Sequence, residues 1–444
     1  MMAAVLVVAL VQQPTTPARA AMPPDSSGGR PCVVEIDSVG GRWQQVEVRK
    51  GETNHFLGGG VLAHCRGTGT SLSADSVALF AGVGRFDMIG KRNPVHIRDT
   101  SITLDATNAS YFLRQERLDA HRNVVAVNRQ TGSVLRGPNL TYYRAVKGVR
   151  DTLEMYASSR PTIDYRASAD SGEPYVIVAD RVRFKGNDRT WGGGRVTIDR
   201  SDFAARSDSM QLDQITGFGL LLGGKPRVEG KGGHSYTLTG TRIELGLAGR
   251  EVRLVKALGD GVGTGSDWRL TADTIHLRID HKKLQQAFAW GPRDSTHAKA
   301  VSTLHTIQAD SLALDLPDEV LTEVRAFRHA FSTSKKDSTA HADVDWIAGD
   351  SLTARWAQES DAAGKSKSAL HQLLARGSAR CFNHFYSARD SAGPSLNYSR
   401  GATIDIALKG DKIDRVVVGG RADGVQLEPK PPAPADTTKK PPSP

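Results

Sequence analysis

Six aspartates recur in one local setting, and a row of carboxylates is the first feature of this sequence that could do chemistry. Each follows a small residue and precedes a stretch of alternating apolar residues, as in Ala74-Asp75-Ser76-Val77-Ala78-Leu79. Such a row could bind ligands or act in acid–base catalysis. We favour a folding role, because the motif is repeated and an unpaired carboxylate on an inward face would cost several kcal/mol. The aspartates are predicted to lie at strand entries, corners or bulges and to cap backbone N–H groups: Asp75, Asp180, Asp208, Asp273, Asp310 and Asp350.

Other short motifs with chemical meaning are weaker. Gly259-Asp260-Gly261-Val262-Gly263 superficially resembles a phosphate loop, but it lacks the Gly-Lys-Ser/Thr ending and the following helix. Cys381 and His384 have the spacing of half a metal site, and no second pair follows at ligand spacing. We therefore expect no catalytic residue, no metal and no cofactor. A glycosidase needs only two carboxylates, so a polysaccharide-acting β-helix enzyme stays open as an alternative among 48 acidic residues.

The elements that would position these residues are short strands. The chain has 444 residues, 45 of them glycine, and its 39% hydrophobic content argues against disorder. After each aspartate alternate residues are apolar, as Ile275 and Leu277 show, and this period of two predicts strands with one inward face. The copies recur every 28 to 40 residues, and this irregularity favours hairpins with variable turns over a tight β-helix.

A second motif follows the first at a fixed distance. Its pattern is apolar-x-x-apolar-x-Ala-x-Gly, as in Val252–Gly259. The offset between the two motifs is 11 residues in four copies, for instance from Asp273 to Leu284. Over Asp350–Leu370 it is 20 residues, and the polar stretch Glu359–Ser368 is interpreted as an inserted loop. The fixed spacing predicts repeated strand–turn–strand units.

Both ends of the chain differ from the repeats. Ala3–Val11 form an apolar run that is followed by Ala18-Arg19-Ala20, a pattern typical of an export signal and its cleavage site. The C-terminal residues run in a Pro-Lys-Pro-Pro-Ala-Pro style that predicts an extended, disordered tail. The expected division is a signal peptide over 1–20, a linker over 21–30, β-repeats over 31–428 and a Pro-rich tail over 429–444.

Charge and aromatic content limit the classes of binding partner, and the cysteines allow one disulfide. Lys and Arg number 58 against 48 Asp and Glu, a net charge of +10 that would suit nucleic acid, acidic glycans or lipid phosphates. The basic residues are spread out and aromatics make up only 6%, so no nucleic-acid module is expected. Cys32 and Cys65 could form a disulfide in an oxidising compartment; alternatively, both stay thiols, as does Cys381.

Several stretches, taken in order, carry a likeness to a known family. They are Gly58-Gly59-Gly60-Val61 leading into Leu72-Ser73-Ala74-Asp75-Ser76; Asn123-Val124 followed by Leu135-Arg136-Gly137-Pro138-Asn139-Leu140-Thr141-Tyr142; Gly193-Gly194-Arg195-Val196 leading to Ala205-Arg206-Ser207-Asp208; and the turn Leu222-Gly223-Gly224-Lys225-Pro226. Over roughly residues 45–428 the chain thereby resembles the OstA-like (organic solvent tolerance-like) superfamily of lipopolysaccharide-transport proteins. The order and repetition of the motifs carry the resemblance.

The resemblance implies an elongated antiparallel β-jellyroll whose two facing sheets form a V-shaped trough for lipid acyl chains. The open sheet ends would pair, strand to strand, with other jellyroll proteins of a transport bridge. The trough would be lined by inward residues of the Asp-led strands: Val77, Leu79, Ile102, Leu104, Val182, Phe184, Ile275, Leu277, Leu312 and Leu314.

The resemblance also implies a function. The protein would be a non-enzymatic scaffold in the periplasm, associated with the outer membrane, and its ligand would be lipopolysaccharide or another glycolipid. A structural or adhesive β-repeat surface protein with an ordinary closed core stays open as an alternative, since inward apolar side chains form cores by default.

Overall fold

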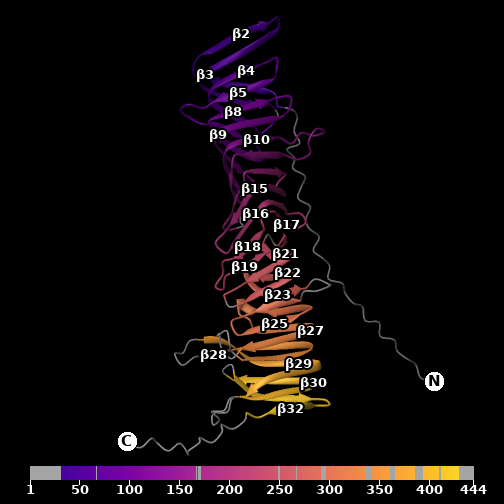
Figure 1. The fold of residues 1–444 in the computed structure, drawn as a ribbon. Coiled ribbons are helices and arrows are strands. Elements are labelled where there is room, and N and C mark those ends of the chain that lie inside the picture. Colours follow the sequence, from indigo (N-terminus) through magenta and orange to yellow (C-terminus); the bar gives the residue numbers. More distant parts are fainter. Residues whose placement is uncertain are drawn as a thin grey trace, which may run out of the picture.

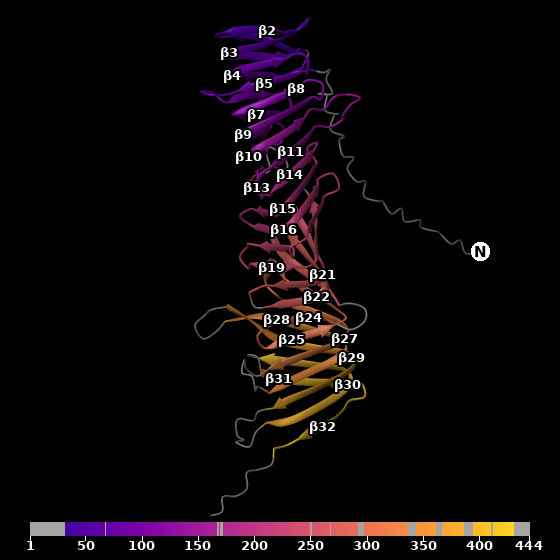
Figure 2. The same ribbon diagram turned by 45° about the horizontal axis from the view of Figure 1, so that its top comes forward.

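The chain forms an all-β column. The computed structural model describes residues 32–429, apart from 67, 167, 169–171, 249–250, 267, 292–296, 336–342, 361–365, 386–393 and 410–411. Within these residues 32 strands pair in one antiparallel sheet, and the only helix described is a short 3₁₀ turn, η1 (Pro317–Glu319). The strands stack from β2 at one end to β32 at the other (Figure 1, Figure 2). The all-β prediction is confirmed, whereas the predicted signal peptide, the linker and residues 430–444 of the tail lie outside the described residues.

The long strands are bent at a corner into two halves. In β21, Gly259 and Asp260 both have positive φ, and a bulge interrupts the ladder there. The first half of β21 pairs with β20 and the second half with β19, so one strand contributes to two arms of the sheet. The long strands are β3 (Glu52–Cys65), β4 (Ser71–Phe80), β9 (Arg117–Asn128), β10 (Val134–Tyr143), β15 (Arg189–Asp199), β16 (Phe203–Asp213), β21 (Glu251–Thr264), β22 (Arg269–Asp280), β27 (Glu323–Lys335), β28 (Val344–Ser360), β29 (Ser366–Phe385) and β30 (Ser395–Lys409).

We call the two arms of the sheet arm A and arm B. Each short strand belongs to one arm only, and two successive short strands pair with the two halves of one bent strand. Arm A holds β1 (Val34–Val39), β6 (Val95–Arg98), β7 (Ile102–Ala106), β12 (Thr162–Tyr165), β13 (Tyr175–Val178), β18 (Arg227–Gly230), β19 (Tyr236–Thr239), β24 (Ala298–Val301), β25 (His305–Ala309) and β32 (Asp423–Leu427). Arm B holds β2 (Trp43–Arg49), β5 (Arg85–Ile89), β8 (Asn108–Phe112), β11 (Glu154–Ser158), β14 (Arg181–Lys185), β17 (Phe218–Leu222), β20 (Arg242–Ala248), β23 (Lys283–Trp290), β26 (Ser311–Asp315) and β31 (Lys412–Gly419). Each arm also contains the halves of the long strands that pair with these short strands.

Six strands at a time close a ring of pairings. β10, β11, β14, β15, β13 and β12 pair in that order, and β12 pairs back with β10. The ring closes because the bent strands β10 and β15 belong to both arms. Three further rings, which begin at β4, β16 and β22, have the same order. Their first strands start at Ser71, Val134, Phe203 and Arg269, so the structural repeat is 63 to 69 residues and spans about two of the predicted units.

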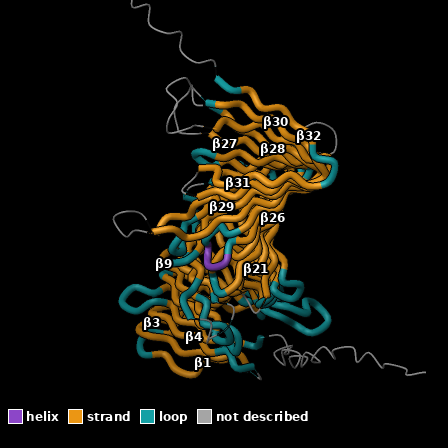
Figure 3. Tube along the Cα trace, turned by 90° about the horizontal axis from the view of Figure 1, so that it is seen from below, coloured by secondary structure: helices purple, strands orange, loops and turns teal. Residues whose placement is uncertain are grey.

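The inward faces of the two arms pack against each other. In β14 the buried residues Val182 and Phe184 alternate with exposed basic residues, as the period of two predicts. Phe184 of arm B and Ile163 of arm A line the same small cavity, and inward residues of both arms form one core cluster. Seen from below, the strands lie one behind another, with loops at the sides of the stack (Figure 3).

The predicted strand–turn–strand units are hairpins, with one correction. β20–β21, β22–β23, β26–β27 and β30–β31 are consecutive antiparallel pairs. The inserted loop expected over Glu359–Ser368 is corrected at its two ends, where β28 and β29 continue their ladder and pair Trp356 with Leu370 and Ser360 with Ser366, whereas residues 361–365 lie outside the described residues.

The corners explain the glycine that ends the second motif. Gly377 has φ 73°, and a Cβ at this position would overlap the carboxylate of Asp350 on the neighbouring strand. Arg328 occupies the equivalent corner of β27 with φ 62°, in the copy that lacks the glycine. Left-handed backbone costs a residue with a Cβ roughly 1–2 kcal/mol, so glycine is favoured at these corners.

Gly377→Ala is expected to lower the free energy of unfolding by more than about 2 kcal/mol, because the overlap with Asp350 adds to the backbone strain. The converse change, Arg328→Gly, should be neutral or slightly stabilising, since relief of strain offsets the greater freedom of the unfolded chain. Denaturant-induced unfolding of both variants beside the native chain measures the difference. Equal destabilisation by the two changes would show that corner conformation does not decide stability.

Candidate functional site

The ten candidate lining residues lie in the core between the arms. Ile102 and Leu104 come from β7 in arm A, and the other eight come from arm B. Leu79 is partly buried and packs against the core cluster, whereas the other nine are buried: Val77, Ile102, Leu104, Val182, Phe184, Ile275, Leu277, Leu312 and Leu314. The residues therefore touch other side chains rather than face an open groove.

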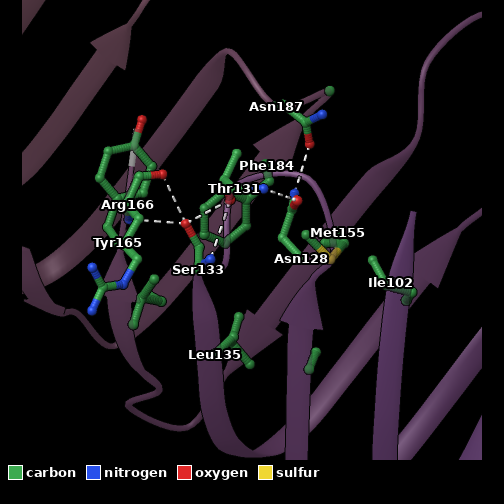
Figure 4. A pocket seen from close by; sticks show the side chains of 13 residues that line it. Ile102, Asn128, Thr131, Ser133, Leu135, Met155, Tyr165, Arg166, Phe184 and Asn187 are labelled. Atoms are coloured by element: carbon green, nitrogen blue, oxygen red, sulfur yellow. Dashed lines mark hydrogen bonds between the residues drawn. The ribbon is translucent and has the colours of Figure 1, made fainter. Parts of the chain in front are cut away.

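Two cavities inside this core are small. One of about 30 Å³ is lined by Ile102 and Leu135 of arm A and by Met155 and Phe184 of arm B (Figure 4). Another of about 20 Å³ lies nearer the N-terminal end, beside Tyr111. These volumes hold one or two water molecules, whereas ligand pockets measure roughly 300–1,000 Å³. A bulky apolar ligand could enter at these two places only if the arms moved apart.

Opposite the corners, the hairpin ends of the two arms face each other, and we call this side the mouth. Asn128, at the end of β9 in arm A, donates from Nδ2 to Oδ1 of Asn187 in an arm B hairpin, at 2.7 Å (Figure 4). Asn187 donates in turn to Oε1 of Gln130, at 2.6 Å. Gln214 of arm B donates to the hydroxyl of Tyr165 in arm A. Side-chain hydrogen bonds, and no strand pairing among the described strands, join the arms here.

The mouth contacts continue along the column. Glu319, which ends η1 in arm B, is buried and accepts a hydrogen bond from the backbone N–H of His234 in arm A, at 3.0 Å. Lys282 of arm B lies 4.0 Å from Asp202 of arm A. Glu319 has φ 72°, a left-handed conformation, and its side chain reaches across the mouth to the His234 N–H. Hydrogen bonds and ion pairs of this kind can be exchanged for water more readily than a strand ladder can.

A buried polar cluster lies at the mouth of the ring that begins at β4, which is the first ring along the chain and is called the first ring below. Arg144 and Glu116 are 6% and 5% exposed, and Arg144 Nη1 lies 3.8 Å from Glu116 Oε2. Tyr111 donates to Glu116, and Tyr142 donates to the buried Asp99 at 3.2 Å. Burial raises the pKa of Tyr111 and of Tyr142, and the adjacent carboxylates raise both further. Both phenols therefore stay neutral donors at physiological pH.

A disulfide fixes the chain beside this cluster. The sulfurs of Cys32 and Cys65 are bonded, and their Cα atoms lie 5.0 Å apart. The backbone N–H of Cys32 donates to Glu116 Oε1 at 2.7 Å and so links arm A to an arm B hairpin. Cys381 is the free cysteine of the described chain; it is buried, and burial raises the pKa of its thiol.

The motif aspartates all lie at corners. Asp75 accepts hydrogen bonds from the backbone N–H groups of Lys91 at 2.6 Å and Asn93 at 3.1 Å, and from Arg92 between them. Other copies use side chains: Asp180 pairs with Arg160 and Arg195, and Asp310 with His297 and His329. Asp208 lies against the glycines that follow β17, Asp350 lies against Gly377 of β29, and Asp273 accepts a hydrogen bond from the Thr274 hydroxyl. They are spread along the column one corner at a time, so they do not assemble a carboxylate site.

The bonds to Asp75 predict a pH dependence of stability. The backbone N–H of Arg92 is the largest cause that holds the pKa of Asp75 below its usual 3.8, followed by that of Lys91. A depressed pKa in the folded state stabilises the protein above the unfolded-state value, and this contribution is lost as the pH falls through the folded-state pKa.

The native chain should therefore melt at a higher temperature than Asp75→Asn at neutral pH, and this difference in melting temperature should close as the pH falls through the lowered pKa of Asp75. Melting curves of both chains across this pH range measure the difference. A difference in melting temperature that stays constant down to the lowest pH would mean that the charge of Asp75 does not stabilise the corner.

The other chemical motifs do not form sites. Cys381 points into the core, where Asn383 contacts its sulfur, whereas His384 bonds to Asp345, so the two residues do not converge. Gly259-Asp260-Gly261-Val262-Gly263 is the corner of β21. In the described part of the chain no three His, Cys, Asp or Glu residues are grouped to hold a metal ion. Nor does any described helix have the length and apolar character needed to span a membrane.

Both ends of the column present edge strands. β2 at the N-terminal end pairs only with β3, and all its residues are exposed, Trp43 by 54%. β32 at the C-terminal end pairs only with β30 and is likewise exposed. Such edges leave one row of backbone donors and acceptors without strand partners.

Sequence reasoning missed the mouth and the buried cluster. Asn128 and Asn187 are 59 residues apart, and Glu319 and His234 are 85 apart. A search for polar residues in the hairpins could have suggested them, but nothing local shows which hairpins face each other. The chain matches no protein-family model and no curated protein, so the family that its sequence resembles stays a prediction.

Proposed function

We propose that the protein is a non-enzymatic scaffold that carries the acyl chains of lipopolysaccharide or another glycolipid between its two arms. The observation that supports this is the apolar core between the arms, which ends at a mouth held by side-chain hydrogen bonds. Inward residues such as Ile275 and Leu277 would exchange contacts with each other for contacts with acyl chains, at roughly 0.8 kcal/mol per buried CH₂. The arms would then be the two sheets of a jellyroll trough, V-shaped when the mouth is open.

We place this scaffold in the periplasm, in contact with the outer membrane. The Cys32–Cys65 disulfide supports an oxidising compartment, because such bonds rarely persist in a reducing cytosol. The exposed edge strands β2 and β32 support strand-to-strand pairing with other jellyroll proteins of a transport bridge.

Locking the mouth tests the proposal. Asn128→Cys and Asn187→Cys place thiols where the two amides now touch, and a short bifunctional thiol reagent can join them. We expect lipid extracts of the purified, unlocked chain to contain a phosphate-bearing glycolipid by mass spectrometry. The chain locked before exposure to lipid vesicles should take up several-fold less.

A matched control separates the effect of closing the mouth from the effect of cross-linking two cysteines as such. Thr141→Cys and Tyr156→Cys are cross-strand partners within arm B, so joining them leaves the mouth free. This pair should load lipid like the native chain. Absence of lipid from every form of the protein would reject the proposal.

A second candidate is a structural β-repeat scaffold without a lipid ligand. The packed core favours it, because the two cavities between the arms hold only about 30 and 20 Å³. Such a protein would carry no lipid whether or not its mouth is locked, so the same experiment decides between the candidates.

A further inference from the structure

An aromatic strip covers the outer face of arm A near the C-terminal end. Trp346 of β28 lies 6.4 Å from Phe382 of β29, centroid to centroid, with their planes 18° apart. Phe331 of β27 and Tyr398 of β30 lie 6.0 and 6.2 Å from Trp346. The strip faces away from the core, because the alternate residue Cys381 is fully buried while the four rings are partly exposed.

The strip is confined to this end of the column. One outer row runs through Tyr398, Phe382 and Trp346 from strand to strand and continues as Thr333 and Thr306 towards the N-terminus. On the other side it reaches Val425 of the edge strand, which is 58% exposed, and Leu427 beside it is 59% exposed. An exposed apolar patch of this kind marks an interaction surface.

The chain that follows β32 has the composition that suits this surface. Residues 429–444 contain the spaced pairs Pro429/Pro432, Pro431/Pro434 and Pro441/Pro444. In a polyproline II helix residues three apart share a face, and grooves lined by aromatic side chains bind that face.

The exit of this segment is next to the strip. Ser395 donates from Oγ to Glu428 Oε2 at 2.6 Å, which fixes the end of β32 beside β30. Phe382 on β29 is two strands from β32, about 10 Å at roughly 4.8 Å per strand. The four peptide units that join Leu427 to Pro431 can span about 13 Å, so the chain is long enough to bring its first prolines to the rings.

We propose that the Pro-rich segment 429–444 docks in polyproline II form on the aromatic strip of its own chain and covers the C-terminal end of arm A. Docking in cis is favoured because the segment leaves the sheet within reach of the strip, which makes its effective concentration there high. The proposal is independent of lipid binding, since the strip is on the outer face.

Hydroxyl-radical footprinting of the full chain tests the docking. The variant Pro431→Ser, Pro432→Ser, Pro434→Ser should show a several-fold faster oxidation of Trp346 and Tyr398 than the native chain. Trp290 is the internal control, because it stacks on Phe288 at 6.1 Å and 18° on arm B, on a different arm from the strip. Unchanged oxidation of Trp346 would overturn the proposal, and so would protection that disappears on dilution, which indicates docking on another copy.

A second readout uses the segment itself. Phe382→Ser should speed trypsin cleavage between Lys439 and Lys440 several-fold by releasing the segment, whereas the matched change Phe288→Ser should leave the rate unchanged. Equal rates in both variants and the native chain would overturn the proposal.

Discussion

Arg144→Met is expected to destabilise the first ring by roughly 3–5 kcal/mol, the usual cost of removing one partner from a buried ion pair. The methionine keeps most of the side-chain volume, but it leaves the buried carboxylate of Glu116 without the guanidinium. The Glu116 carboxylate would still accept bonds from Tyr111 and from the backbone N–H of Cys32, so the loss reports mainly on the missing charge.

Hydrogen exchange resolved by strand is the suitable measurement for Arg144→Met, because a column of repeats can open locally instead of unfolding as a whole. Amides of β8 and β9 should lose protection, while those of β25 and β27 should not. Arg183→Met is the matched control, since Arg183 is half-exposed and pairs with Glu154 at 3.2 Å on the outer face. Exposed pairs of this kind contribute up to about 1 kcal/mol, so equal effects of the two changes would contradict a buried cluster.

Loss of the disulfide should have the second largest effect. Cys32 and Cys65 close a loop with a sequence separation of 33, and cross-linking a loop of this size stabilises by about 3–4 kcal/mol. The double variant Cys32→Ser, Cys65→Ser should therefore expose the amides of β1, which pairs only with β3. The bond from the Cys32 N–H to Glu116 should be lost with it, so the mouth of the first ring should also loosen.

A reductant provides the control for the disulfide. It should bring the hydrogen exchange of native β1 to that of the double serine variant and leave the variant itself unchanged. The C-terminal strands should not respond in either chain. A native β1 that stays protected under full reduction would mean that strand pairing alone holds the N-terminal end.

Local periodicity was enough to predict the strands and their inward faces. Ile275 and Leu277 alternate with polar neighbours and are fully buried, because a period of two matches the pleat of a strand. The fixed offset from Asp273 to Leu284 corresponds to the hairpin of β22 and β23. These features depend on residues close together in the chain, so they can be read from the sequence.

The bend and the mouth could not be predicted in the same way. The ring of β10 to β15 closes through pairings such as Leu135 with Ile163, and no short motif encodes which strands meet. The polar stretch Glu359–Ser368 suggested a loop because polarity alone does not distinguish a loop from the ends of paired strands, which the described residues at both of its ends form. Glu116 and Arg144 likewise look like ordinary hairpin residues, and only the packed arms show that they are buried together.

Photo-crosslinking from inside the core tests the central claim, that lipid enters between the arms, most directly. Phe184→p-benzoylphenylalanine places a photoreactive aromatic probe on the inward face, and Phe288→p-benzoylphenylalanine places the same probe on the outer face. After irradiation of cells that produce these chains, we predict a glycolipid adduct on the chain with the probe at 184 and none on the chain with the probe at 288. No lipid adduct at 184, or equal yields at both positions, would contradict the account.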